Sequence, residues 1–160
     1  MDFNSDFQRD IALNIVRVTE VAALRASRWM GMGDKNAADQ AAVDGMRGML
    51  DMLNLKGVVV LGEGEKDEAP MLYNGEIVGN CSNNSVEVDI AVDPIDGTRL
   101  VANGTANALS VIAVSERHSI AYLPTFYVMK IAYGSKLKGS IDINCSVREN
   151  LKVAAAKLGK

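Results

Sequence analysis

Two carboxylates three positions apart, Asp93 and Asp96, are the residues of this chain best suited to chemistry. They follow an alternating apolar run from Val86 to Val92 whose β-branched residues predict a strand. Pro94 has no amide hydrogen and a fixed φ, so we expect it to end this strand and to turn both carboxylates toward one point. Two converging carboxylates need a cation, and hard oxygen ligands suit Mg²⁺ or Mn²⁺.

The two residues after Asp96 extend this hypothesis to a ligand. Gly97 would let the backbone approach a bound molecule, and Thr98 would place a hydroxyl at the start of a helix. Free N–H groups at a helix start attract anions, so a metal ion beside them suits a phosphate ester. The alternative is an ordinary turn, because Asp, Pro and Gly are common turn residues.

A second group of acids follows a short apolar strand that we expect at 57–61. Four acids lie within six residues, namely Glu63, Glu65, Asp67 and Glu68. The glycines between them permit tight turns at the end of a strand, where the sites of layered α/β folds tend to lie. A solvated run of charges is the alternative interpretation.

Two long amphipathic patterns predict helices at about 5–29 and 36–53. Asp34 or Asn36 would cap the second helix. Asp39 lies in its first turn or two, and the positive end of the helix dipole favours a carboxylate there. The helix alone therefore gives Asp39 a structural explanation.

The remaining patterns predict further helices and strands. We expect a short helix from 98 to about 103, strands at about 107–115, 120–123, 127–132 and 139–143, and a last helix that opens with a capping box from Ser146 to Glu149. His118 is given no role. Lys35 and Arg99 could bind phosphate, but surface charge is the commoner role of such residues.

Length, composition and charge favour a single-domain protein and argue against nucleic-acid-binding and membrane-spanning classes. At 160 residues and 48% hydrophobic content, the chain can form one core, so we expect a single domain over 1–160. A net charge of -3, with both signs well mixed, argues against nucleic acid as a partner. No apolar run approaches the ~20 residues of a membrane span, and the first residues lack a signal-peptide pattern, so we expect a cytoplasmic protein. Cys81 and Cys145 show no metal-binding spacing, and we expect reduced thiols.

Three stretches carry a resemblance to a known family. They are WMGMGDKNAAD at 29–39, GEGEKDEAPMLY at 62–73 and VDIAVDPIDGT at 88–98. Together they resemble the class II fructose-1,6-bisphosphatases, which include cyanobacterial enzymes that also hydrolyse sedoheptulose-1,7-bisphosphate. The second stretch is the most specific to that family, whereas DPIDGT is shared across the wider lithium-sensitive phosphatase superfamily. Weaker matches extend the resemblance over almost the whole chain.

The resemblance implies the N-terminal half of a layered α-β-α-β-α sugar-phosphatase fold. It implies metal-dependent hydrolysis of the 1-phosphate of fructose-1,6-bisphosphate, or of sedoheptulose-1,7-bisphosphate, in gluconeogenesis or the Calvin cycle. The implied metal ligands are Asp39, Glu63, Asp93 and Asp96, with Mg²⁺ or Mn²⁺ as the cofactor. The implied substrate-binding residues are Asp96, Gly97, Thr98 and Tyr127, and Thr98 would also serve catalysis by orienting the attacking water.

Two departures from the family keep alternatives open. Asp96 stands where similar members often carry Glu. The chains of the family are also much longer, and their C-terminal half carries another acidic metal ligand and most of the residues that bind the substrate, the small sugar bisphosphate. The alternatives are a phosphatase of the inositol-monophosphatase type and a non-catalytic metal-binding fragment or assembly half. An apolar face left uncovered would favour self-association, so we expect a homo-oligomer.

Overall fold

The computed structural model describes residues 5–62, 71–122 and 128–160. The chain divides into two compact units, residues 1–122 and 123–160, each of which is described by itself. None of the helices in the described ranges is long and apolar enough to cross a lipid bilayer. Cys81 and Cys145 are both exposed free thiols.

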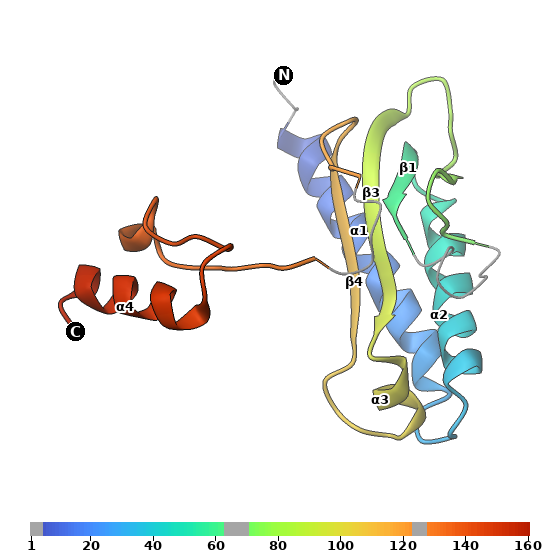
Figure 1. The fold of residues 1–160 in the computed structure, drawn as a ribbon. Coiled ribbons are helices and arrows are strands. Elements are labelled where there is room, and N and C mark those ends of the chain that lie inside the picture. Colours follow the sequence, from blue (N-terminus) through green and yellow to red (C-terminus); the bar gives the residue numbers. More distant parts are fainter. Residues whose placement is uncertain (1–4, 63–70, 123–127) are drawn as a thin grey trace. The chain divides into compact units, whose positions relative to one another are not determined.

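A mixed four-stranded sheet forms the centre of the first unit (Figure 1). Its strands are β1 (Leu55–Leu61), β2 (Ile77–Val78), β3 (Val86–Asp96) and β4 (Leu109–Glu116), in the order β2-β1-β3-β4. β1 and β3 are parallel, whereas β2 and β4 run antiparallel to their neighbours. The strands predicted at 57–61, 86–92 and 107–115 are confirmed with shifted ends. β2 was not predicted, because two residues are too few to show an alternating pattern.

Two long helices, α1 (Ser5–Ser27) and α2 (Lys35–Leu50), pack against each other and against β3. Both helices were predicted, and together with the sheet they confirm a layered α/β architecture. The core lies between the helices and the sheet because alternate strand residues face the small and branched side chains of the helices. Its fully buried residues include Val18, Ala22, Ala42, Val43, Met46, Leu50, Leu55, Val59 and Ile90.

The prediction that Pro94 ends the third strand is wrong, because β3 continues through Pro94 to Asp96. Asp93 pairs with Val111 and Asp96 pairs with Leu109, so Pro94 and Ile95 together face the single residue between those partners. This is a β-bulge, and proline is tolerated at a bulge because the ladder needs no N–H there. Pairing with β1 stops at Ala91, so Pro94 interrupts no hydrogen bond on that side either.

A buried carboxylate fastens the end of β4 to β3. Asp89 is fully buried, and its carboxylate accepts hydrogen bonds from Arg117 Nη1 at 2.5 Å and from the Ile120 amide at 3.0 Å. Burial by itself raises the pKa of Asp89, but hydrogen bonds from the Ile120 and His118 amides and from Arg117 outweigh it and lower the pKa to about 2. The turn after β4 is therefore held by an ionised carboxylate.

The second unit contains α4 (Val147–Leu158), which begins with the predicted capping box. The Ser146 hydroxyl accepts a hydrogen bond from the Glu149 amide at 3.2 Å, and the Glu149 carboxylate accepts one from the Ser146 amide at 2.9 Å. Gly159, with φ of 68°, ends the helix in the left-handed conformation that favours glycine.

Three of the predicted strands are wrong wherever the structure describes them. Residues 120–122, 128–132 and 139–143 contain no strand, and a single 3-10 turn, η1 (Ser135–Leu137), lies among them. An alternating apolar pattern forms a strand only where a neighbouring strand can pair with it. At one of these three places the backbone forms hydrogen bonds with a side chain of α4. The Asp142 amide donates to Asn150 Oδ1 at 3.0 Å, and Asn150 Nδ2 donates to the Asp142 carbonyl at 2.7 Å. Asp142 is thus tied to α4 instead of to a sheet.

Candidate metal-binding active site

The end of β3, the short helix α3 (Thr98–Ala102) and the start of α2 lie together at one end of the first unit (Figure 1). α3 follows β3 directly through Gly97, whose φ of 95° is a left-handed conformation. The predicted short helix at this place is confirmed. The loop before α2 is joined to α3 by backbone hydrogen bonds, Gly31 N–H to Val101 O at 2.9 Å and Gly33 N–H to Ala102 O at 2.8 Å.

The bulge in β3 places Asp93 and Asp96 on the same side of the sheet. Residues three apart face opposite sides in a regular strand. Here their partners on β4 are Val111 and Leu109, which are two apart and share a face, and cross-strand partners also share a face. Both carboxylates therefore lie on the same face of the sheet. The two carboxylates share this face because of a bulge within the strand, and not because the strand ends at Pro94.

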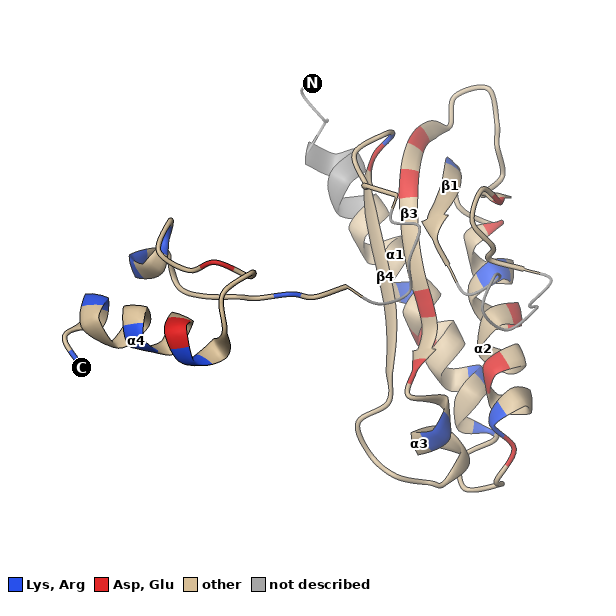
Figure 2. Cartoon of the chain, viewed as in Figure 1, with Lys and Arg blue, Asp and Glu red and all other residues tan. Residues whose placement is uncertain are grey.

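Asp93 is half-buried and Asp96 is exposed, so the pair spans the boundary between protein and solvent. Figure 2 shows acidic positions along β3 and a basic position in α3. The basic residue is Arg99, which is exposed, as is Lys35 at the start of α2. Exposure agrees with the interpretation of both as surface charges.

Asp39 is the fifth residue of α2 and is half-buried. The helix begins where it does because Asp34 Oδ1 accepts a hydrogen bond from the Ala37 amide at 2.9 Å, which confirms Asp34 as the cap. Asp39 thus belongs to the helix end that is joined to α3. This placement brings the elements of Asp39, Asp93 and Asp96 to one end of the unit.

Glu63 and Tyr127, the other two predicted site residues, lie outside the described residues. The residues on either side of 63–70 contact each other directly. The Gly62 amide donates to Asn74 Oδ1 at 2.9 Å, and a β-carbon on Gly62 would lie 2.0 Å from the Leu72 carbonyl oxygen. The backbone at Gly62 therefore packs directly on the backbone at Leu72, and only glycine fits there.

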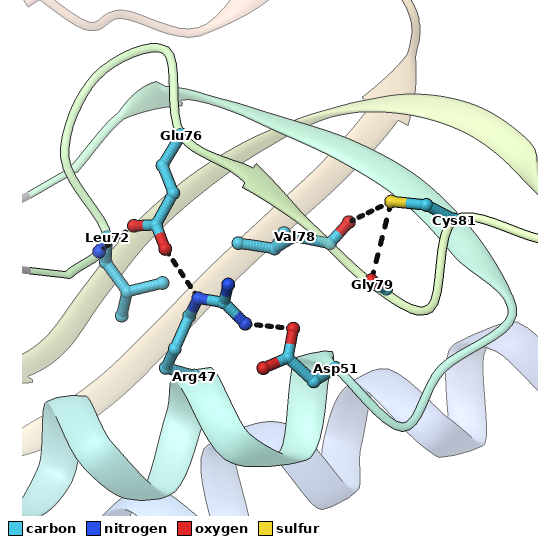
Figure 3. Close-up of polar contacts among 7 residues, drawn as sticks. All are labelled: Arg47, Asp51, Leu72, Glu76, Val78, Gly79 and Cys81. Atoms are coloured by element: carbon cyan, nitrogen blue, oxygen red, sulfur yellow. Dashed lines mark hydrogen bonds and ion pairs between the residues drawn. The ribbon is translucent and has the colours of Figure 1, made fainter.

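A buried ionic network holds Leu72 in this position (Figure 3). Glu76, which is 8% exposed, accepts a hydrogen bond from Arg47 Nε at 2.5 Å and another from the Leu72 amide. Arg47 of α2 also pairs with Asp51. Burial lowers the pKa of Arg47, but its hydrogen bonds with Asp51 and Glu76 outweigh burial and raise that pKa above its usual value. Leu72 itself is fully buried with φ of 57°.

The donor chemistry at this end of the unit fits a hard divalent cation. Asp39, Asp93 and Asp96 offer carboxylate oxygens, the ligands that Mg²⁺ and Mn²⁺ prefer. Within the described residues, no three acidic, histidine or cysteine side chains are close enough together to hold a metal ion. The predicted fourth ligand, Glu63, is not among those residues, so the ligand set stays a prediction.

Comparison with known protein families identifies the chain. Residues 9–160 match the model of the family described as bacterial fructose-1,6-bisphosphatase, glpX-encoded. The chain belongs to this family. The match runs through all the described elements of the site, and the predicted resemblance to the class II fructose-1,6-bisphosphatases is confirmed.

Individual members of the family are similar over most of this chain. Fructose-1,6-bisphosphatase 1 class 2 of Escherichia coli (strain K12) is 51% identical over 153 residues, which make up 96% of this chain and 45% of that protein. The class 2 enzyme of Haemophilus influenzae is 51% identical over 152 residues, with 95% and 45% covered. The D-fructose 1,6-bisphosphatase class 2/sedoheptulose 1,7-bisphosphatase of Thermosynechococcus vestitus is 46% identical over 160 residues, with 94% and 46% covered. The chain thus spans about half the length of these curated relatives.

Sequence reasoning missed Arg47, Glu76 and Asn74, which organise the residues around the family's GEGE segment. In the sequence, Arg47 is an ordinary polar residue of an amphipathic helix. Its partner Glu76 is 29 residues away along the chain, so no local pattern links the two. The sequence signal that could have pointed to this region is the Asn74-Gly75 pair, because such a pair is typical of a turn.

Proposed function

We propose that the protein represented by this chain is a metal-dependent phosphatase that hydrolyses the 1-phosphate of fructose-1,6-bisphosphate. Membership of the bacterial fructose-1,6-bisphosphatase family supports the reaction class. Similarity to a relative named for both activities extends the proposed substrate to sedoheptulose-1,7-bisphosphate. The role in gluconeogenesis or the Calvin cycle, the cytoplasmic location and the homo-oligomeric state are part of the same proposal.

The observation that carries the proposal is the bulge that turns Asp93 and Asp96 to one face of the sheet, directly before α3. Two carboxylates on one face offer oxygen donors to the same side of the sheet, and such donors are the ligands that Mg²⁺ and Mn²⁺ prefer. The start of α2, which carries Asp39, is joined to α3 beside them. A cation at this place would find oxygen donors from separate elements of the fold.

Each predicted site residue has a distinct task in this mechanism. Asp39, Glu63, Asp93 and Asp96 would bind Mg²⁺ or Mn²⁺. A bound cation supplies Lewis-acid chemistry, since it polarises the phosphoryl oxygens and lowers the pKa of a coordinated water. Thr98, the half-buried first residue of α3, would orient the attacking water through its hydroxyl. Asp96, Gly97 and Tyr127 would contact the substrate.

Calorimetric titration with Mn²⁺ tests the metal assignment. The chain should bind Mn²⁺, and an Asp93→Asn, Asp96→Asn double variant should lose that binding because amides are weaker ligands for hard cations. A Glu87→Gln variant is the matched control, since Glu87 is an acid of the same strand that pairs with Lys56 at 2.8 Å. Equal affinity in the parent chain and the double variant would rule the assignment out.

A phosphate-release screen tests the substrate. Fructose-1,6-bisphosphate, sedoheptulose-1,7-bisphosphate and inositol phosphates would be compared with Mn²⁺ present, using a protein of the relatives' full length. Turnover of inositol phosphates alone would overturn the sugar assignment in favour of the inositol-monophosphatase alternative.

The 160-residue chain should be assayed beside the longer protein. We propose that it binds metal but hydrolyses sugar bisphosphates poorly, because remote substrate contacts contribute to the rate as well as to affinity. Turnover in the ordinary range of roughly 1–10³ s⁻¹ would show that these residues contain a complete site.

A further inference from the structure

Four exposed side chains form one stripe along α1. They are Leu13, Arg17, Glu20 and Leu24, and their spacing of four, three and four residues places them one above another on the same face of the helix. The two leucines are 63% and 68% exposed, and both charged residues are exposed as well. We call these four residues the α1 stripe.

The α1 stripe lies opposite the buried face of the helix. That buried face contains Val18, Ala22 and Ala26, which belong to the core of the first unit. At 3.6 residues per turn, these three residues lie about half a turn around the helix axis from the stripe. The core therefore leaves the two leucines in water, where covering them with another molecule would be favourable.

The α1 stripe has a leucine at each end and an ion pair in the middle. Arg17 Nη1 and Glu20 Oε2 are 2.9 Å apart. The midpoint of this pair along the helix is also the midpoint between Leu13 and Leu24. A twofold axis through that point would place each leucine opposite the other leucine of a second copy, and each charged residue opposite its counter-charge.

We propose that the α1 stripe is a dimerisation surface, on which α1 of a second copy of this chain docks antiparallel. A twofold interface uses the same patch on both copies, so the patch has to be complementary to itself. The antiparallel arrangement meets this condition, because leucine meets leucine at both ends and the central charges alternate in sign. A parallel arrangement would place Arg17 against Arg17 and Glu20 against Glu20, and like charges in contact disfavour association.

The inference rests on the homo-oligomeric state in the proposed function and names the surface for it, and it is independent of the phosphatase reaction. Two other occupants are a different protein and a further part of a longer chain, since this chain makes up 45% of the Escherichia coli relative. Neither of these occupants requires a stripe that is complementary to itself. The symmetric order of leucine, base, acid and leucine therefore favours a second copy.

Charge reversal with cross-complementation tests the surface. Arg17→Glu gives the stripe two acids and Glu20→Arg gives it two bases, so each variant alone should repel itself at both symmetric contacts. A mixture of the two variants opposes acids to bases and should form a heterodimer. Combining both substitutions in one chain exchanges the two charges and should restore self-association. Lys56→Glu is the matched control, since Lys56 forms an exposed ion pair with Glu87 away from α1.

Sedimentation equilibrium of the 160-residue chain at about 1–100 µM is the measurement, because a single pair of helices is a small interface that should dissociate in this range. We expect each single reversal to raise the dimer Kd by about 100-fold, since attraction becomes repulsion at two symmetric contacts. The mixture and the double reversal should return the Kd to within about threefold of the parent value. Lys56→Glu should leave it unchanged, and similar thermal midpoints would show that all variants are folded.

The outcomes separate the α1 stripe from the rest of the proposed function. A parent chain that dimerises with the same Kd as the single reversals overturns the stripe and leaves the homo-oligomeric state intact. A parent chain that is monomeric over the whole range overturns both, whereas the phosphatase reaction is tested separately by phosphate release. The single reversals should also be made in a protein of the relatives' full length. A lowered thermal midpoint there, with an unchanged oligomeric state, would mean that the chain itself covers the stripe and would overturn the proposal.

Discussion

Removal of the Glu76 carboxylate is the sharpest test of how the first unit is held together. Glu76→Ala deletes the acceptor of two hydrogen bonds, one from Arg47 on α2 and one from the Leu72 amide. The side chains of Glu76 and Arg47 are only 10% and 20% exposed, so water cannot readily replace the lost partner. Leu72 is fully buried, and its amide would keep no acceptor.

The magnitude follows from these contacts. Breaking a buried ion pair by removing one partner costs about 3–5 kcal/mol, largely because a charge is left unpaired. Arg47 retains its pair with Asp51, which reduces that cost. The orphaned amide of Leu72 adds roughly 1–3 kcal/mol. We therefore expect Glu76→Ala to lower the free energy of unfolding by about 3 kcal/mol, and Glu76→Gln, which keeps an acceptor, by roughly half as much.

Urea denaturation followed by circular dichroism measures this loss. The control is Glu87→Ala, which removes the acid of the exposed Lys56–Glu87 pair between β1 and β3 and should shift the midpoint only slightly. The denaturant dependence should stay the same in all variants, because the surface exposed on unfolding is unchanged. If Glu76→Ala and Glu87→Ala unfold at the same urea concentration, the reasoning about the buried network is wrong.

Three further predictions concern separate parts of the first unit. The pKa of Asp89 is lowered to about 2, so its carboxylate stabilises the fold above its unfolded pKa and loses that contribution as the pH falls through about 4 to 2. Asp89→Asn should therefore weaken the dependence of the free energy of unfolding on pH in this window, and an unchanged dependence would contradict the assignment. Gly48→Ala should raise the free energy of unfolding by about 0.5–1 kcal/mol, because this exposed position within α2 has no atom within 4 Å of an added β-carbon; a lower urea midpoint would refute it. Thr98→Val in a full-length protein should reduce kcat by ~10²–10⁴-fold at unchanged Mn²⁺ affinity, since a positioned proton-handling group contributes on that scale. A kcat near that of the parent protein would mean that Thr98 serves only as the first residue of α3.

The sequence by itself determined the local elements of this protein and supplied the hypothesis about which residues carry its chemistry. The amphipathic periods of α1 and α2, the Asp34 cap and the Ser146 capping box are interactions between residues a few positions apart, so the pattern contains them in full. The same holds for the apolar strand before DPIDGT. The family resemblance was also readable, because the GEGE and DPIDGT stretches are contiguous.

The tertiary structure decided everything that depends on partners distant in the chain. The bulge at Pro94 exists only because β4 pairs with β3 in that register, and it is what puts Asp93 and Asp96 on one face. The strands expected near 120, 130 and 140 are absent from the described residues there. An alternating pattern forms a strand only where a neighbouring strand can pair with it. Likewise Arg47 meets Glu76, and Gly31 meets Gly104, only after α2, β1 and α3 have packed. Side-chain periodicity is local, but hydrogen-bond partners and close backbone contacts are set by the packing of the whole unit.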